Sequence, residues 1–213
     1  MLKFYYNPIS VNSRRVWVTL LEKNIPFDPV LINLDGDQFS DEFTAVNPLQ
    51  RVPAIAHNGF HVIESLSILA YLEAKFPTPS LMPSEPEPIA RVQMVSTITV
   101  TELQPETFPM TRSMIGLDVE PQKLESAQQR IDTILTFFED LLGENSYFAG
   151  EMFTLADIVA GTLVPSIPLD NYPHLSAWTE RLSQRESWQK TAYTPEAIAT
   201  ALPNIRAILE SRT

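Results

Sequence analysis

The sequence predicts a small α/β domain followed by an all-helical domain. Three observations predict this fold class. Strand and helix patterns alternate over the first third of the chain in the order βαβα and then ββα, a proline-rich stretch runs from Pro77 to Pro88, and apolar residues beyond it recur at helical spacing. We therefore expect domains over residues 1–77 and 89–213, joined by an ordered linker over residues 78–88.

The predicted α/β domain opens with a strand. Leu2–Tyr6 is a short apolar and aromatic run, which is typical of a buried strand, and Asn7-Pro8 ends it. A helix and a second strand, over Asp28–Leu34, follow. The apolar face expected for the helix comprises Val16, Trp17, Leu20 and Leu21.

The second half of this domain is predicted to be a hairpin and a helix. A short helix ends at Asn47-Pro48, and two strands, Val52–Ala56 and Phe60–Ile63, flank the dipeptide Asn58-Gly59, a strong hairpin signal. Glu64-Ser65 then opens a helix. Its expected buried face comprises Ile68, Leu69 and Leu72.

The remainder of the chain is helical by its apolar period. One long stripe ends at Gly143, Thr154 to Asp157 resembles a capping box, and Pro195 begins the last helix. The stripe comprises Ile131, Ile134, Leu135, Phe138, Leu141 and Leu142; a further helix is marked by Leu175, Trp178 and Leu182, and the last by Ile198, Leu202, Ile205 and Leu209.

Composition excludes several classes of chemistry. The 213 residues include no cysteine, which excludes disulfides, zinc–thiolate sites and cysteine nucleophiles. The three histidines lack metal-ligand spacing, so no metal is expected. A net charge of −11 argues against nucleic acid or an anionic membrane as a partner. The chain opens without a charged leader and a long apolar run, so no signal peptide is expected and a cytoplasmic protein is favoured.

Four segments, in order, resemble the soluble glutathione transferases. Residues 47–55 (NPLQRVPAI) resemble the NP-x-x-x-VPAL segment of that family, and residues 64–72 (ESLSILAYL) resemble its ES-x-x-I-x-x-YL helix start. Residues 7–16 (NPISVNSRRV) resemble the first strand–helix turn of the serine-type phi, theta and delta classes, and residues 153–158 (FTLADI) resemble the F-(S/T)-x-AD-(I/L) helix start. The resemblance implies a thioredoxin-like N-terminal domain.

The resemblance also implies which residues bind glutathione. The Val52-Pro53 bond, if it is cis as in the family, exposes the Val52 backbone to the cysteinyl backbone of glutathione. Ser65 at a helix N-terminus fits the γ-glutamyl carboxylate, and Glu64 lies near the ligand's amine. Pro53 and Ser65 could instead have only local structural roles: Pro53 would turn the chain, and Ser65 would cap the helix. For the glycyl carboxylate the matching positions are Gln38, Gln50 and Arg51.

The thiol of glutathione requires a donor, because the thiolate is the nucleophile and a free thiol has a pKa near ~8.5. Ser10, just before the first helix, is the expected catalytic residue. Ser13 and Tyr6 are the alternatives: Ser13 caps or begins the same helix, and tyrosine-type relatives use a tyrosine near the end of this strand. Without cysteine, the cysteine-type classes are excluded as mechanisms.

The helical domain is expected to line the electrophile pocket. The predicted apolar lining comprises Phe108, Met110, Thr111 and Met114, although such spacing also occurs in cores. Two positions depart from the family pattern. Leu66 stands where relatives often carry an arginine at the subunit contact, and Gln38 stands where delta-type relatives carry histidine.

The predicted function is therefore that of a homodimeric detoxification enzyme. It would activate the thiol of glutathione, as co-substrate and without a further cofactor, for conjugation to hydrophobic electrophiles. Reduction of organic hydroperoxides would use the same thiolate. The alternatives are a binding or interaction protein of the same fold without turnover, and a glutathione-dependent isomerase or dehalogenase.

Overall fold

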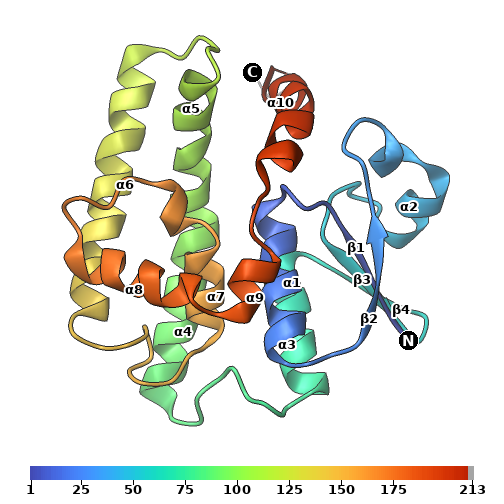
Figure 1. Ribbon diagram of the computed structural model, residues 1–213, viewed down its shortest axis with the longest axis horizontal. Coiled ribbons are helices and arrows are strands. Elements are labelled where there is room, and N and C mark those ends of the chain that lie inside the picture. The colour runs from blue at the N-terminus through green and yellow to red at the C-terminus, as the bar shows by residue number, and fades with distance from the viewer. Residues whose placement is uncertain (211–213) are drawn as a thin grey trace. The chain divides into compact units, whose positions relative to one another are not determined.

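The computed structural model describes residues 1–210 of the chain, and its first part is built on a four-stranded mixed sheet (Figure 1). The strands are β1 (Leu2–Tyr6), β2 (Phe27–Leu31), β3 (Ala54–His57) and β4 (Phe60–Ile63), in the order β2-β1-β3-β4. β1 is parallel to β2 and antiparallel to β3, and β3 is antiparallel to β4. The predicted βαβ-α-ββα domain is confirmed.

Alternation along β1 explains how both faces of the sheet are covered. Tyr6 points to one face, where its ring contacts Trp17 of α1 (Val11–Glu22) at a centroid distance of 5.2 Å. Tyr5 points to the other face, where its ring lies at a centroid distance of 5.8 Å from the Phe43 ring. Figure 1 shows α1 and α3 (Ser65–Lys75) on one side of the sheet and α2 (Asp41–Val46) on the other.

Two predicted strands differ in extent from the structure. The second strand stops at Leu31 instead of Leu34, because the chain turns into a loop in which Asp37 accepts hydrogen bonds from the backbone and side-chain N–H groups of Asn33. The third strand begins at Ala54, since Pro53 has no N–H to donate to the sheet. The hairpin at Asn58 and Gly59 is confirmed, with positive φ angles of 52° and 82°.

The remaining elements are helices, as the sequence predicts. The long apolar stripe lies in α6, where all its residues except the half-buried Leu141 are buried, and the helix ends at Gly143, where φ is 52°. The helices are α4 (Pro86–Ile98), α5 (Gln104–Met114), α6 (Pro121–Leu142), α7 (Leu155–Gly161), α8 (Pro173–Ser183), α9 (Glu186–Lys190) and α10 (Pro195–Glu210); a π-helical turn (Thr99–Leu103) joins α4 to α5, and 3-10 turns occur at Asp37–Phe39 and Val164–Ser166.

The capping box predicted at the start of α7 is present. The Asp157 carboxylate accepts hydrogen bonds from the Thr154 N–H (2.8 Å) and hydroxyl (2.9 Å). It also accepts from the Phe148 N–H (3.0 Å) and the Trp178 indole N–H (3.1 Å). Asp157 is completely buried, and burial raises its pKa to about 6, although these hydrogen bonds oppose the shift. This residue holds helices together inside the helical unit.

Two compact units make up the chain. The first comprises Met1–Leu81 with Arg185–Ala201, and the second comprises Met82–Gln184 with the chain from Leu202 onward. Helix α9 therefore belongs with the sheet, although the sequence assigns it to the second domain. Helix α4 starts inside the expected 78–88 linker, because proline fits the first helical turn. Residues 211–213 of the expected 89–213 domain lie outside the described residues.

Candidate functional site

The sheet brings the ends of three strands to one edge. Tyr5 near the end of β1 pairs with Ala54 at the start of β3, and Ala54 pairs with Ile63 at the end of β4. β2 runs parallel to β1 and ends at the same edge. The loops that leave this edge carry the predicted glutathione-binding residues and the predicted catalytic serine, which are far apart in sequence.

Ser10 lies at this edge as the N-cap of α1. Its backbone is extended (φ −78°, ψ 116°), and its Oγ accepts a hydrogen bond of 3.2 Å from the Ser13 N–H. Its carbonyl accepts the Arg14 N–H at 2.9 Å. Within residues 1–210 the Ser10 hydroxyl donates to no group, so its proton is available for a ligand. The helix N-terminus here also favours negative charge.

The two alternatives to Ser10 have other contacts. Ser13 is completely buried, and its Oγ accepts the Asn7 N–H at 3.3 Å. The Tyr6 ring stacks on Phe4 at a centroid distance of 5.1 Å and contacts Trp17 on the core side of the sheet. These positions favour Ser10 as the residue that reaches a ligand.

The loop before β3 presents an open piece of backbone. The Val52-Pro53 peptide bond is cis. The Asn47 side chain shapes the preceding turn, because its Nδ2 donates to the Arg51 carbonyl at 2.5 Å and its Oδ1 accepts the Leu49 N–H at 2.9 Å. Neither the N–H nor the C=O of Val52 forms a hydrogen bond within the part of the chain that the structure describes. Such a backbone can pair with an extended ligand.

The start of α3 combines an unusual backbone with free donors. Glu64 occupies the N-cap position with φ 66° and ψ 122°, which is uncommon for a residue other than glycine, and its side chain caps nothing. Strained backbone of this kind is concentrated at functional sites. Ser65 is therefore the first helical residue instead of the cap, and it is buried. Neither its hydroxyl nor its N–H has a partner within residues 1–210.

The three residues expected at the glycyl carboxylate differ in exposure and in whether their side chains already form hydrogen bonds. Gln38 is buried, and its amide accepts the Gly36 N–H (3.1 Å) and donates to the Leu34 carbonyl (3.3 Å). Gln50 donates to the Thr44 hydroxyl at 3.3 Å. Arg51 is exposed and forms no ion pair within the described chain. Arg51 is therefore the most accessible donor of the three.

The residues expected to line the electrophile pocket all lie in α5, in the second unit. Met114 is largely exposed at 84 % and Phe108 at 38 %, while Met110 and Thr111 are half-buried. The Thr111 hydroxyl donates to the Thr107 carbonyl at 2.8 Å. Their accessibility is compatible with a pocket lining, which stays a prediction.

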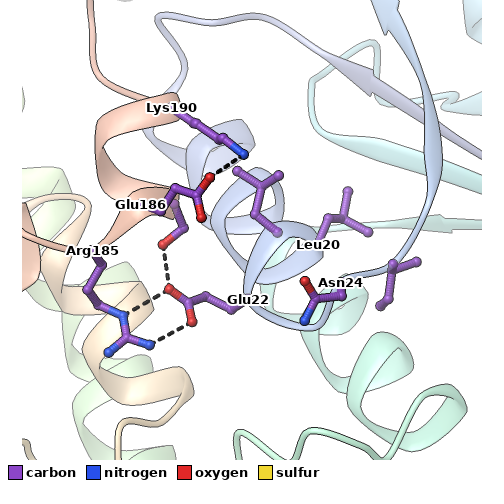
Figure 2. A pocket seen from close by; sticks show the side chains of 9 residues that line it. Leu20, Glu22, Asn24, Arg185, Glu186 and Lys190 are labelled. Carbon is purple, nitrogen blue, oxygen red and sulfur yellow. Dashed lines mark hydrogen bonds and ion pairs between the residues drawn. The ribbon is translucent and has the colours of Figure 1, made fainter.

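A hollow of about 450 Å³ lies at the other end of α1, between that helix end and α9 (Figure 2). Its charged groups are paired: Arg185 donates to both carboxylate oxygens of Glu22 at 2.9 and 2.7 Å, and Lys190 pairs with Glu186 at 2.6 Å. None of the predicted site residues lines it. We therefore place the candidate site at the sheet edge.

Two kinds of element are absent from the part of the chain that the structure describes. Among the described residues no cluster of histidine or acidic side chains has the geometry of a metal site. Within the same residues no helix has both the length and the apolarity needed to span a membrane.

Comparison with known proteins supports the interpretation of the fold. The profile of the glutathione S-transferase N-terminal domain matches residues 4–80, and that of the C-terminal domain matches residues 92–186. The structure of human glutathione S-transferase T1-1 in its apo form is similar, with a TM-score of 0.81 and 25% identity over 98% of this chain and 100% of that one.

Alignments with curated relatives cover most of this chain and most of each relative. Maleylacetoacetate isomerase of Rattus norvegicus is 31% identical over 187 residues, which cover 83% of this chain and 85% of the relative. Glutathione S-transferase theta-1 of Mus musculus is 30% identical over 200 residues, covering 85% and 82%.

The fold and the family matches define a two-domain transferase with a thioredoxin-like first domain. The chain belongs to the glutathione S-transferase family. It is a glutathione transferase in function, as the sequence predicts.

Proposed function

We propose that this chain binds glutathione along the sheet edge that carries Ser10, Val52 and Ser65, and that Ser10 holds the thiolate. The observation that carries this proposal is the set of unused groups at that edge: within residues 1–210 the Ser10 hydroxyl donates to no group, and the Val52 backbone and the Ser65 hydroxyl have no partners. Buried or half-buried polar groups in proteins are normally paired, so a cluster of unpaired ones indicates a ligand.

The chemistry at the thiol follows from the position of Ser10. A hydrogen bond from its hydroxyl favours the charged form of the sulfur, and the N-terminus of α1 adds a favourable dipole. Both lower the pKa of the bound thiol from near ~8.5. The Ser10 oxygen accepts the Ser13 N–H, which leaves the hydroxyl free to donate its proton to the sulfur.

The rest of glutathione would be held by its backbone and its two carboxylates. Val52 would pair with the cysteinyl backbone as an added strand. The γ-glutamyl carboxylate would accept from the Ser65 hydroxyl and the N-terminus of α3, with Glu64 near the amine. Arg51 would bind the glycyl carboxylate, with Gln50 and Gln38 as weaker donors, because their amides already have partners in their own loops.

The bound thiolate would attack an electrophilic carbon. A carbon–sulfur bond forms while a leaving group departs with its electron pair, or, for addition, the electron pair moves onto the acceptor and a proton follows. Phe108, Met110, Thr111 and Met114 of α5 would present the apolar electrophile. Reduction of an organic hydroperoxide would oxidise two thiols to a disulfide and release an alcohol and water. We place the enzyme in the cytoplasm as a homodimer that detoxifies electrophiles.

A matched pair of serine variants tests this proposal. Ser10 and Ser40 both cap helices by accepting a backbone N–H at 3.2 Å, but only Ser10 lies at the proposed thiol. Each alanine variant should lose about 1 kcal/mol of unfolding free energy. Conjugation to an aryl halide at neutral pH should fall about 10- to 100-fold in Ser10→Ala only. Equal activity in the two variants would contradict the role of Ser10.

Isomerisation is the second candidate function, because a relative 31% identical to this chain is named maleylacetoacetate isomerase. The same thiolate would add to an activated double bond, permit rotation and leave again. Measuring turnover of a cis-enone carboxylate at catalytic glutathione concentrations distinguishes this reaction from conjugation, which consumes glutathione. Glutathione binding with neither reaction would instead indicate a binding protein.

A further inference from the structure

The first turn of α1 carries an unusual distribution of charge. Arg14 ends that turn, Arg15 follows it directly, and the turn contains no acidic residue. Cations at a helix N-terminus are unfavourable, because they face the positive end of the helix dipole. Helix α2 shows the usual arrangement, with Asp41 and Glu42 in its first turn. A local preference broken in this way is expected at functional positions.

Arg14 is held by a segment from the far end of the sequence. Its Nε donates to the Thr191 hydroxyl at 3.3 Å, and its guanidinium carbon lies 5.1 Å from the centre of the Tyr193 ring. Thr191 is buried and donates in turn to the Ser187 carbonyl at 2.8 Å, at α9. Both residues belong to the same compact unit as the sheet. Within residues 1–210 Arg14 forms no ion pair with a carboxylate.

Tyr193 packs against positively charged side chains. Its hydroxyl is buried and has no hydrogen-bond partner in the part of the chain described. Burial raises the pKa of this phenol, whereas the positive charges of Arg14 and Arg15 lower it. Arg15 is completely buried, which lowers its own pKa to about 10, and it donates to the Asn12 side chain at 2.5 Å. The Arg14 guanidinium lies over the Tyr193 ring.

We propose that Tyr193 and Thr191 are positioning residues of the thiol site, which hold the positive charge of Arg14 at the start of α1 beside Ser10. This inference rests on the proposed role of Ser10 in thiolate binding. Arg14 lies one helical turn after Ser10, because its backbone N–H donates to the Ser10 carbonyl at 2.9 Å. An unneutralised cation at this helix end stabilises an anion, and the C-terminal segment keeps that cation in place.

The test compares Tyr193→Leu with Tyr193→Phe and a control. Tyr193→Leu removes the ring, and we expect the pKa of the thiol of bound glutathione to rise and kcat at neutral pH to fall by about threefold to tenfold, with the KM for glutathione little changed. Tyr193→Phe keeps the ring beneath Arg14 and should restore both values. Thr191→Val, which removes the acceptor of the Arg14 Nε–H, should show a smaller change in the same direction.

Tyr147→Leu is the matched control, because Arg181 lies over the Tyr147 ring at 5.9 Å in the other unit. It should reduce stability without changing the thiol pKa. The inference is overturned if Tyr193→Leu leaves the thiol pKa and kcat at their wild-type values, or if Tyr147→Leu shifts them equally. Failure of the proposed function looks different: the thiol would then be un-ionised at neutral pH in the wild-type protein itself.

Discussion

The two ends of α1 differ in whether their polar and charged groups have partners. At its N-terminal end Ser10 has a free hydroxyl proton and Arg14 has no carboxylate partner within residues 1–210. At its C-terminal end the charged groups are satisfied: Glu22 accepts from Arg185 and Ser187, and Lys23 pairs with Glu73. Unpaired donors are found at the end where we propose that glutathione binds, and paired charges are found at the end that stabilises the fold.

The largest expected effect comes from breaking the pairing at the C-terminal end. The Lys23 side chain is completely buried and donates to Glu73 at 2.7 Å and to the Pro79 carbonyl at 2.6 Å. Removing one partner of a buried pair leaves a charge without compensation. Lys23→Met should therefore lower the free energy of unfolding by about 3–5 kcal/mol, measured by urea denaturation. A loss below about 1 kcal/mol would show that this end contributes little stability.

A pH-dependent effect of similar size is expected from Asp157, a buried carboxylate remote in sequence from α1. Its pKa is about 6 in the folded chain and 3.8 ordinarily, so the folded state holds more protons between these values. Its contribution to stability therefore decreases as the pH rises from about 4 to about 6, by about 3 kcal/mol. The control is Asp157→Asn, which cannot titrate. Wild type should lose stability relative to this variant over that interval, and parallel curves would contradict the assignment.

Glu22 should show a smaller effect of opposite sign, which sharpens the contrast within α1. Burial would raise its pKa, but hydrogen bonds from Arg185 and Ser187 and the charge of Arg185 outweigh burial and lower it. Its stabilising contribution is therefore complete above the ordinary value of 4.5 and is lost as the pH falls through the lowered pKa.

The variant Glu22→Gln measures this contribution. At pH 7 we expect a loss of about 1 kcal/mol of unfolding free energy, because the partly exposed Arg185 regains hydration in the variant. The difference from wild type should shrink in strongly acidic buffer. Conjugation activity per folded molecule should stay unchanged, since the proposed thiol site lies at the other end of the helix. A large loss of activity would break the comparison between the two ends.

Local signals in the sequence predict the sheet, the hairpin and most of the helices. Asn58-Gly59 supplies the positive φ angles of the turn, Gly143 ends α6, and Thr154 with Asp157 caps α7, each through chemistry that neighbouring residues determine. The start of α4 is harder to predict, because a proline-rich stretch is equally typical of a linker and of a first helical turn.

Contacts between segments that are distant in sequence cannot be predicted from local signals. The association of Arg14 with Thr191 and Tyr193, and of Glu22 with Arg185, joins residues more than 160 positions apart, and no period or motif encodes it. The consecutive arginines without an acid in the first turn of α1 were the only available signal. The positive φ of Glu64 likewise depends on how β4 meets α3, which a single sequence does not specify.

The most direct test of the account is the ionisation of glutathione on the protein. The thiolate absorbs in the ultraviolet, so difference absorbance across pH gives the thiol pKa for wild type and Ser10→Ala. We predict a thiolate well below the free value of ~8.5 in wild type, and a pKa about 1 to 2 higher in the variant. Binding of glutathione without any lowered pKa, or the same lowered pKa in both proteins, would contradict the assignment of the thiol site to Ser10.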